Sequence, residues 1–425
     1  MNKPRDTHRR ENAGISFPMR TIPRRKPYFA PGAKAALFTS LRGGKSDQAR
    51  ETADLEAALA GELGLQNPAV AASGRIALRL LLETSGLTPG AEVLVPGYTF
   101  SLLFPAIEAS GFTPIPVDID PLSFQMDSTK AESAVTEHTG AILATHIFGE
   151  PCEIEGFVKI AEKHKLLLVE DCAQALGARR GGAGVGSFGD AAISSFDISK
   201  PLQGIRGGVA FGRNADWIAK VRERITGSPT PGPATAEIIK GFAETALVGS
   251  PLWRGPMMLF SNNSTRDMLV KLYRKGESSE SAPGMKKEIR EASLPGPLAR
   301  AVRENLPSLG KRLERRRRIR ETYIETLSDI LSFQRTSYSN ESSCHMVVAT
   351  TGTDVAALRR FLAKRGIDAA IREEIADNMI TGKGSATEAV FKSAIALPIY
   401  CDLGDDDLRR VIEFVRLGYN KHRNA

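Results

Sequence analysis

The stretch Leu166-Leu-Leu-Val-Glu-Asp-Cys-Ala-Gln-Ala175 decides the fold. A continuous apolar run that ends in Glu170-Asp171 is typical of a strand buried in a parallel sheet, because such strands are covered on both faces. Open α/β sheets bind their ligands beyond the carboxyl ends of the strands. We therefore expect Asp171 to face a ligand, although an aspartate there could equally cap the following helix.

Short β-rich runs alternate with amphipathic helical stretches on both sides of this segment. The expected strands are residues 92–95, 114–117, 141–145, 166–169, 191–196 and 208–211, and the expected helices are residues 75–83, 103–110 and 154–163. Alternating strands and helices imply crossover connections. The pattern predicts an α/β fold whose sheet is mostly parallel.

The 425 residues exceed the usual ~150 residues of one domain. We expect a basic N-terminal arm (1–28), a large domain (29–225), a divergent insertion or interdomain segment (226–305) and a smaller C-terminal α+β domain (306–425). The apolar residues 238–260 include Lys240, Glu244 and Arg254. They are expected to form a buried or interfacial helix rather than a membrane span.

Composition is that of a soluble folded protein, with 42% hydrophobic and 25% charged residues. Part of the net charge of +8 comes from the N-terminal tail and from the basic run 311–320. We interpret the run 311–320 as a solvated helix face. Neither cluster has interleaved aromatics, so nucleic-acid binding is not expected. No apolar leader or membrane-length run occurs, and a cytoplasmic location is expected.

The four cysteines include no CxxC pair and fit neither a disulfide framework nor a metal site. Two phosphate-loop patterns also fail. Residues 184–189 match GxGxxG, but a strand-like run follows them where a helix is required. Gly43-Gly-Lys-Ser46 lacks both the preceding glycine of a P-loop and an apolar strand leading into it.

A second group of residues gives Asp171 a chemical context. Lys200 follows it by 29 residues, and Ser73-Gly74 opens a helix whose N–H groups could bind a phosphate. Ser195 could add a hydroxyl, and Phe100 could cover an aromatic ring or simply lie in the core. Pyridoxal phosphate (PLP) requires a lysine, a carboxylate for its ring nitrogen and phosphate anchors. The residues therefore indicate a PLP site.

Further motifs occur in order along most of the chain. They are Ser73-Gly74 with Ala77-Leu78, residues 89–96, Thr99-Phe100, residues 116–121, 146–149, 170–175 and 186–192, Ser195-Phe196, Lys200, Gly207-Gly208 and residues 397–400. In this the chain resembles the DegT/DnrJ/EryC1/StrS sugar aminotransferases. The resemblance implies the fold of PLP-dependent transferases (aspartate aminotransferase-like) and a homodimer.

The resemblance also implies residue roles. Lys200 would be the Schiff-base lysine, Asp171 the partner of the ring nitrogen, Gln174 a contact on the cofactor's hydroxyl side, Ser195 a phosphate ligand and Phe100 the stacking ring. The chain departs from the family pattern at Arg75, which follows Ser73-Gly74 in the expected cofactor site, and at Asp197 and Arg206. These arginines would either recruit a further anion or mark altered specificity.

By this resemblance the substrates are an amino acid, glutamate by family implication, and a nucleotide-linked keto sugar. The expected activity is amino transfer to that sugar in polysaccharide or amino-sugar biosynthesis. A PLP-dependent sugar dehydratase is an alternative, but family dehydratases carry a histidine in place of Lys200. A degenerate member that acts as a binding protein is the non-enzymatic alternative, motivated by Arg75, Asp197 and Arg206.

Overall fold

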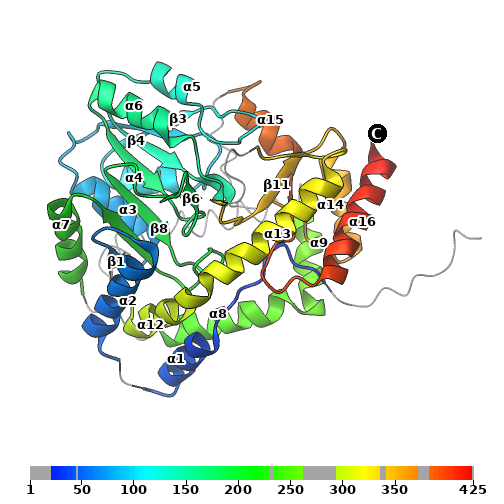
Figure 1. The fold of residues 1–425 in the computed structure, drawn as a ribbon, viewed down its shortest axis with the longest axis horizontal. Helices are drawn as coiled ribbons and strands as arrows, with labels where there is room; N and C mark the ends of the chain where they lie inside the picture. Colours follow the sequence, from blue (N-terminus) through cyan, green and yellow to red (C-terminus); the bar gives the residue numbers. More distant parts are fainter. Residues whose placement is uncertain are drawn as a thin grey trace, which may run out of the picture.

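A seven-stranded sheet forms the centre of the larger part of the protein (Figure 1). The computed structural model describes residues 21–44, 46–229, 234–261, 293–335, 341–371 and 382–423. Strands β3, β2, β4, β5 and β8 run parallel, and β9 and β1 complete the sheet in antiparallel pairings. The strands in sheet order are β1 (Ala69–Ala71), β9 (Gly208–Gly212), β8 (Ala191–Ser195), β5 (Leu167–Asp171), β4 (Thr139–Thr145), β2 (Glu92–Pro96) and β3 (Thr113–Val117).

Successive residues of the central strands bury their side chains on opposite faces of the sheet. In β2, Val93 and Val95 pack with one layer of helices, whereas Leu94 packs with another. The first layer contains α3 (Gly74–Glu83), α4 (Leu103–Ala109) and α7 (Ala215–Thr226). The opposite face carries α5 (Ser128–Ser133), α6 (Ile154–His164), α1 (Pro31–Leu41), α2 (Gln48–Leu63) and α12 (Gly296–Asn305). Burial on both faces explains the continuous apolar runs in the sequence.

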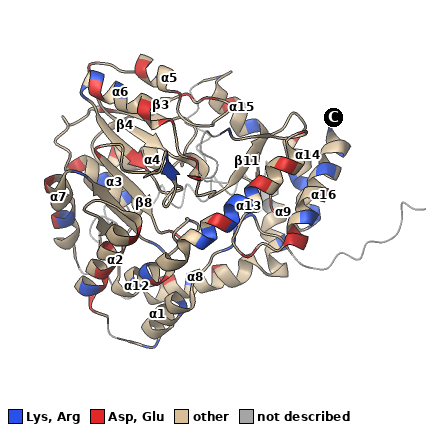
Figure 2. Cartoon of the chain, viewed as in Figure 1, with Lys and Arg blue, Asp and Glu red and all other residues tan. Residues whose placement is uncertain are grey.

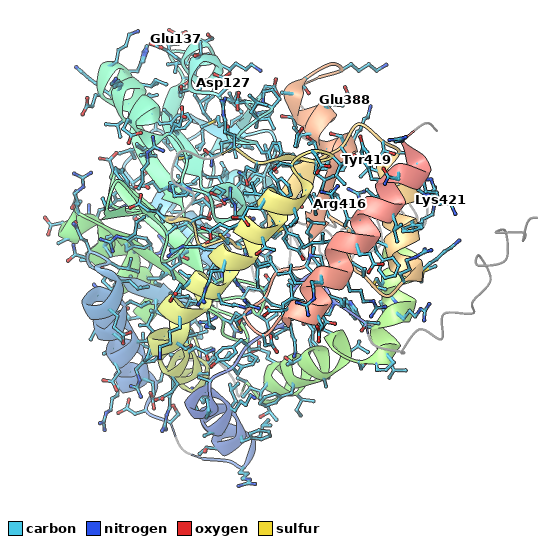
Figure 3. All side chains as sticks on the ribbon, turned by 45° about the vertical axis from the view of Figure 1, so that its right-hand side comes forward. Asp127, Glu137, Glu388, Arg416, Tyr419 and Lys421 are labelled. Carbon is cyan, nitrogen blue, oxygen red and sulfur yellow. The ribbon has the colours of Figure 1, made fainter. Side chains whose placement is uncertain are left out.

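A smaller antiparallel sheet organises the C-terminal part. It consists of β10 (Ser332–Phe333), β11 (Val347–Thr350) and β12 (Ala394–Leu397), with α13 (Leu309–Leu327), α14 (Val355–Lys364), α15 (Ala386–Ser393) and α16 (Asp405–His422). Figure 1 shows α13 running from beside α12 toward this sheet. Arg416, labelled on α16 in Figure 3, bonds Asp329 just beyond α13 at 2.8 Å (Nη1 to Oδ2).

The ends of two predicted segments differ from expectation. Ile22 is fully buried and pairs with Ile367, so residues 21–28 are part of the fold rather than of a basic arm; residues 1–20 lie outside the described part. The predicted insertion 226–305 contains α8 (Thr235–Val248), a 3-10 turn (Pro251–Trp253), α9 (Arg254–Ser261) and α12. Leu298 and Val302 of α12 are fully buried in the core of the larger part.

The predicted strands and helices are confirmed, each boundary lying within two residues of expectation. The sheet is mostly parallel, as the alternation predicts. Within the described ranges no helix combines the length and apolarity needed to cross a bilayer.

Candidate active site

Asp171 ends β5 and is buried at the carboxyl edge of the parallel strands. Its Oδ1 accepts a hydrogen bond from the N–H of Ala173 at 2.9 Å. Burial raises the pKa of Asp171, while this bond and the positive charge of Lys200 act in the opposite direction. The positive charge of Lys200 therefore interacts with the Asp171 carboxylate, and a cationic partner would stabilise the ionised form of this buried group.

Lys200 lies on the loop between β8 and β9, and its backbone N–H bonds the carbonyl of Asp197. Its Nζ lies 5.6 Å from the centroid of the Phe100 ring. Phe100 precedes α4, beyond the end of β2. The structure thus brings together the amine, the acid and the aromatic ring predicted from the sequence, from three different strand ends.

The Ser73-Gly74 turn lies against the end of β8. Ser73 caps α3, its Oγ accepting the N–H of Ile76 at 3.2 Å. A Cβ atom on Gly74 would lie 3.2 Å from the Cβ of Ser195, and one on Gly208 would lie 2.3 Å from the nitrogen of Gly74. The small residues allow the start of α3 to approach the sheet closely, which places the Ser195 hydroxyl beside a helix N-terminus.

Gln174 is oriented by its hydrogen bonds. Its Oε1 accepts the N–H of Phe148 at 2.8 Å, which fixes the amide and turns its NH₂ group the other way. Its backbone carbonyl accepts the hydroxyl of Ser343 at 2.7 Å, so the C-terminal part is tied to this loop.

The structure describes the surroundings of the three residues that depart from the family pattern, namely Arg206, Asp197 and Arg75. Arg206 Nε bonds Glu237 of α8 at 3.0 Å, and its Nη1 bonds the carbonyl of Ala72 at 3.3 Å. Asp197 accepts two bonds from Ser199. Arg206 therefore joins α8 to the turn at the start of α3. Arg75 is the second residue of α3 and is partly buried.

The role of Glu170, the residue before Asp171, was not predicted from the sequence. Its carboxylate accepts bonds from three backbone N–H groups, of Gly186, Phe188 and Gly189, and contacts His146 Nε2 at 3.0 Å. His146, Glu170 and Cys172 are all buried and have potential ligand atoms within 4.8 Å of one another. Burial raises the pKa of Cys172 to about 12, so its thiol stays protonated.

The glutamate side chain is thus already occupied by backbone and imidazole donors. Alternation along β5 points Glu170 and Asp171 to opposite faces. The first ties the strand to the 186–189 turn, and the second faces the candidate site. The sequence contains both partners, because Glu170 lies next to Asp171 and His146 begins the His146-Ile-Phe-Gly149 motif. That Glu170 pairs with His146, however, depends on the strand order.

The prediction of a solvated basic helix at 311–320 is wrong for part of its length. Arg312, Arg316 and Arg320 of α13 are buried, whereas Arg318 lies on the outside. Figure 2 shows the basic residues gathered toward the end of α13 that lies nearer α12. The three buried arginines are spaced by four residues, and this spacing directs them to one face of the helix.

The four cysteines are unpaired in the structure, in agreement with the absence of a predicted disulfide framework. The rejected GxGxxG stretch at 184–189 leads into β8 and not into a helix, as the sequence indicates.

Comparisons with known proteins bear on the family and the fold of the chain. The profile of the DegT/DnrJ/EryC1/StrS aminotransferase family matches residues 31–231 and 255–416. The chain is 41% identical over 169 residues to the UDP-N-acetyl-3-dehydro-alpha-D-glucosamine 3-aminotransferase of Acidithiobacillus ferrooxidans, covering 40% of this chain and 46% of that protein. It is 35% identical over 177 residues to the GDP-perosamine synthase of Caulobacter vibrioides, covering 42% and 48%. The chain spans about half the length of these curated relatives.

Solved structures support the fold. The aminotransferase TlmJ from Streptoalloteichus hindustanus superposes with a TM-score of 0.74 at 22% identity, over 94% of this chain and 99% of that chain. A DegT DnrJ EryC1 StrS aminotransferase from Brucella abortus gives a TM-score of 0.70 at 22% identity, over 90% and 94%. The predicted fold class is confirmed. With the family profile matched along most of its length, the chain belongs to the DegT/DnrJ/EryC1/StrS aminotransferase family.

Proposed function

We propose that the protein is a PLP-dependent aminotransferase that moves an amino group from an amino acid, glutamate by family implication, to a nucleotide-linked keto sugar. The observation that carries the proposal is the convergence of Lys200, Asp171 and Phe100 at the carboxyl edge of the sheet. The printed names of the two relatives above, one a UDP-sugar aminotransferase and the other a GDP-perosamine synthase, support a sugar nucleotide as acceptor.

The residues present fit PLP. Asp171 would hold the ring nitrogen, Phe100 would cover a ring face, and Gln174 would contact the hydroxyl side through its NH₂ group. Ser73, Gly74, Arg75 and Ser195 would surround the phosphate, where a helix N-terminus favours an anion. The bound group would supply an electron sink for bonds broken at the substrate carbon.

The side chains of the protein have two tasks in the proposed reaction. Lys200 would hold the cofactor through Nζ and, when released, the same amine would act as general base and then general acid, first taking the proton from the α-carbon of the substrate. Asp171 holds a proton on the ring nitrogen, because a buried carboxylate interacts strongly with a nearby cation. The desolvation that raises the pKa of Asp171 is then offset by this cation.

A homodimer remains part of the proposal, as does a site that includes residues of the partner subunit. In such a dimer the cofactor would contact a second chain as well as the residues above. Sedimentation of the purified protein with and without PLP tests this assembly.

The absorbance spectrum of the purified protein tests the cofactor assignment. We expect PLP to give the visible band of a lysine-bound cofactor, and Lys200→Ala to abolish that band. Lys220→Ala, a substitution at an exposed lysine of α7, is the matched control and should retain it. A wild-type protein that takes up no PLP, or a Lys200→Ala variant with an unchanged band, would refute the proposal.

A screen of amino acids against the loaded protein tests the reaction class. Loss of the visible band on adding glutamate, with formation of 2-oxoglutarate, indicates the first half of amino transfer. When a nucleotide-linked keto sugar is then added as the second substrate, formation of a deoxy sugar without an amino group would instead support the dehydratase alternative.

A further inference from the structure

The turn formed by Phe148 and Gly149, between β4 and α6, has an unusual backbone. Phe148 has φ 60° and ψ 9°, in the left-handed region, and Gly149 has φ 92°. Cys344, in the loop before β11, also has a positive φ, of 47°. Residues other than glycine rarely adopt this conformation, and strained residues of this kind cluster at functional sites. Two of them in segments that contact each other therefore point to a role for this backbone.

The turn and the loop before β11 are bonded to each other. The N–H of Ser343 donates to the carbonyl of Gly149 at 3.0 Å, and the N–H of Met346 donates to the carbonyl of Phe148 at 3.1 Å. A Cβ atom on Gly149 would collide with the Ser343 hydroxyl. The Phe148 ring is fully buried and meets the Tyr98 ring edge to face, with the centroids 5.9 Å apart. The surrounding structure thus holds the strained backbone in place.

The two segments hold Gln174 at two points, one on its side chain and one on its backbone. The N–H of Phe148 donates to Gln174 Oε1 at 2.8 Å, and the Ser343 hydroxyl donates to the Gln174 carbonyl at 2.7 Å. Ser343 is fully buried, and Gln174 is 5% exposed. Phe148 belongs to the larger part and Ser343 to the C-terminal part. Both parts therefore fix the direction in which the Gln174 NH₂ group points.

We propose that Ser343 and the Phe148-Gly149 turn form a clamp that sets the Gln174 amide against the cofactor, so that the C-terminal part controls how firmly the bound cofactor holds its proton. The inference rests on the proposed function, in which the Gln174 NH₂ group contacts the hydroxyl side of PLP. Ser343 acts through Gln174 and is therefore a positioning residue.

The chemistry of the cofactor gives the direction of the effect. PLP bound to a lysine shares one proton between its imine nitrogen and the neighbouring hydroxyl-side oxygen, and the visible band belongs to the form that holds this proton. A hydrogen bond donated to that oxygen stabilises the form without the proton. A clamp that presses the NH₂ group onto the oxygen therefore lowers the pH at which the band is lost.

Other titratable groups lie around the clamp, and the variants below alter none of them. They are His146 and Glu150 beside the turn, Asp171 of β5, Lys200 of the β8–β9 loop, Arg320 of α13 and His345 of the loop before β11. Glu150 is paired with Arg320 at 3.2 Å, and burial lowers the pKa of His345 well below its usual value, so that His345 is neutral. A shift of the band between the wild type and a serine variant then reports on Gln174.

A pH titration of the visible band of the PLP-loaded protein tests the clamp. We expect Ser343→Ala to raise the pH of the transition by about 0.5 to 1 unit, the size expected for one weakened hydrogen bond. Ser342→Ala is the matched control. Ser342 is equally buried and lies in the same loop, but its hydroxyl bonds the Gly149 carbonyl at 3.0 Å and Glu150 at 2.8 Å. The transition of this control should match that of the wild type.

A double-mutant cycle tests whether Ser343 acts through Gln174. Gln174→Leu removes the amide and should raise the pH of the transition at least as far as Ser343→Ala does. Adding Ser343→Ala to Gln174→Leu should then cause no further shift, because the two residues act as one unit. An equal shift by Ser343→Ala in both backgrounds would overturn the proposal.

Melting temperatures separate positioning from stability. Each serine variant leaves a buried carbonyl without its donor, so both should melt below the wild type. A purely structural role for Ser343 predicts that the two variants also titrate alike. That result, or an unshifted band in Ser343→Ala, would overturn the clamp.

Hydrogen exchange of the cofactor-free protein separates this inference from the proposed function. The Phe148 amide should exchange about 10-fold faster or more in Ser343→Ala, because a freed Gln174 no longer holds that N–H continuously. A protein without a cofactor band refutes the proposed function and the link to the cofactor's proton, and an unchanged Phe148 amide would refute the clamp itself. A normal band that does not shift in Ser343→Ala overturns the further inference alone.

Discussion

Glu170 gives the sharpest test of how the site is supported. Its Oε1 accepts the N–H groups of Phe188 and Gly189 at 2.8 and 2.7 Å. Its Oε2 accepts the N–H of Gly186 at 2.8 Å and lies 3.0 Å from His146 Nε2. In Glu170→Gln the side chain keeps its shape, but an NH₂ group must replace one oxygen. Two of the four donors then face another donor.

The imidazole cannot adapt to the substitution. Cys152 N–H donates to His146 Nδ1 at 3.0 Å, so the ring proton is on Nε2 and points at Glu170. Moving the proton to Nδ1 would set it against the Cys152 N–H. At about 2 kcal/mol for each buried donor left without an acceptor, the two losses total about 4 kcal/mol. Burial alone would raise the pKa of Glu170, but the His146 and backbone bonds keep it below its usual value, so the wild-type carboxylate is ionised at neutral pH.

Hydrogen exchange measures this loss where it occurs. We expect the amides of residues 186–189 to exchange about 100-fold faster or more in Glu170→Gln, together with a lower urea midpoint. Glu155→Gln is the control, because Glu155 is half-exposed and pairs with Arg180 at 2.6 Å. A pair of this kind contributes about 0–1 kcal/mol. If both variants lose less than about 1 kcal/mol and residues 186–189 stay protected, the Glu170 network does not support β5 as argued.

Two further substitutions test how the site is assembled. Gly208→Ala places a Cβ 2.3 Å from the backbone of Ser73 and Gly74, so we expect a loss of stability of about 3 kcal/mol and weaker PLP binding, measured by urea unfolding and cofactor titration; unchanged PLP affinity would contradict this. Asp118 accepts hydrogen bonds from the backbone N–H and the hydroxyl of Thr387 at the start of α15. Burial would raise the pKa of Asp118, but these bonds and Lys130 hold it well below its usual value. Its contribution is therefore present above about pH 4 and lost as pH falls, and Asp118→Asn should flatten the acid side of a stability–pH profile; an unaltered acid limb would show that the bond contributes little.

The central sheet was predictable because its strands are buried on both faces and therefore have continuous apolar sequences. Asp171 could be placed at a strand end for the same reason. Several elements escaped prediction, and among them β1, with three residues, and β10, with two, are too short to show a period. Residues 21–24 escaped for another reason. Their polar sequence hides a fully buried Ile22, whose partner Ile367 lies more than three hundred positions away.

For the candidate site, the sequence predicted the types of the residues but not their arrangement in space. A lysine, an acid, an aromatic ring and a Ser-Gly turn could be chosen from the sequence, because each follows a strand or opens a helix. That Lys200 lies over Phe100, and that its charge reaches Asp171, depends on the order of β2, β5 and β8 in the sheet. Local periodicity carries no information about that order.

Arg316 and Arg320 are two residues whose burial was not predicted from the sequence. Both follow the spacing of the apolar face of α13, on which Ile319 and Tyr323 are fully buried, and that spacing could have predicted their burial. Charge argued for the opposite, since an arginine is normally left in water. Only the partners distinguish the two residues: Glu150, far along the chain, neutralises Arg320, while no described carboxylate does so for Arg316. A buried charge with its partner belongs to the fold, so Arg320→Met, which leaves the buried Glu150 without its cation, should lower the urea midpoint of unfolding.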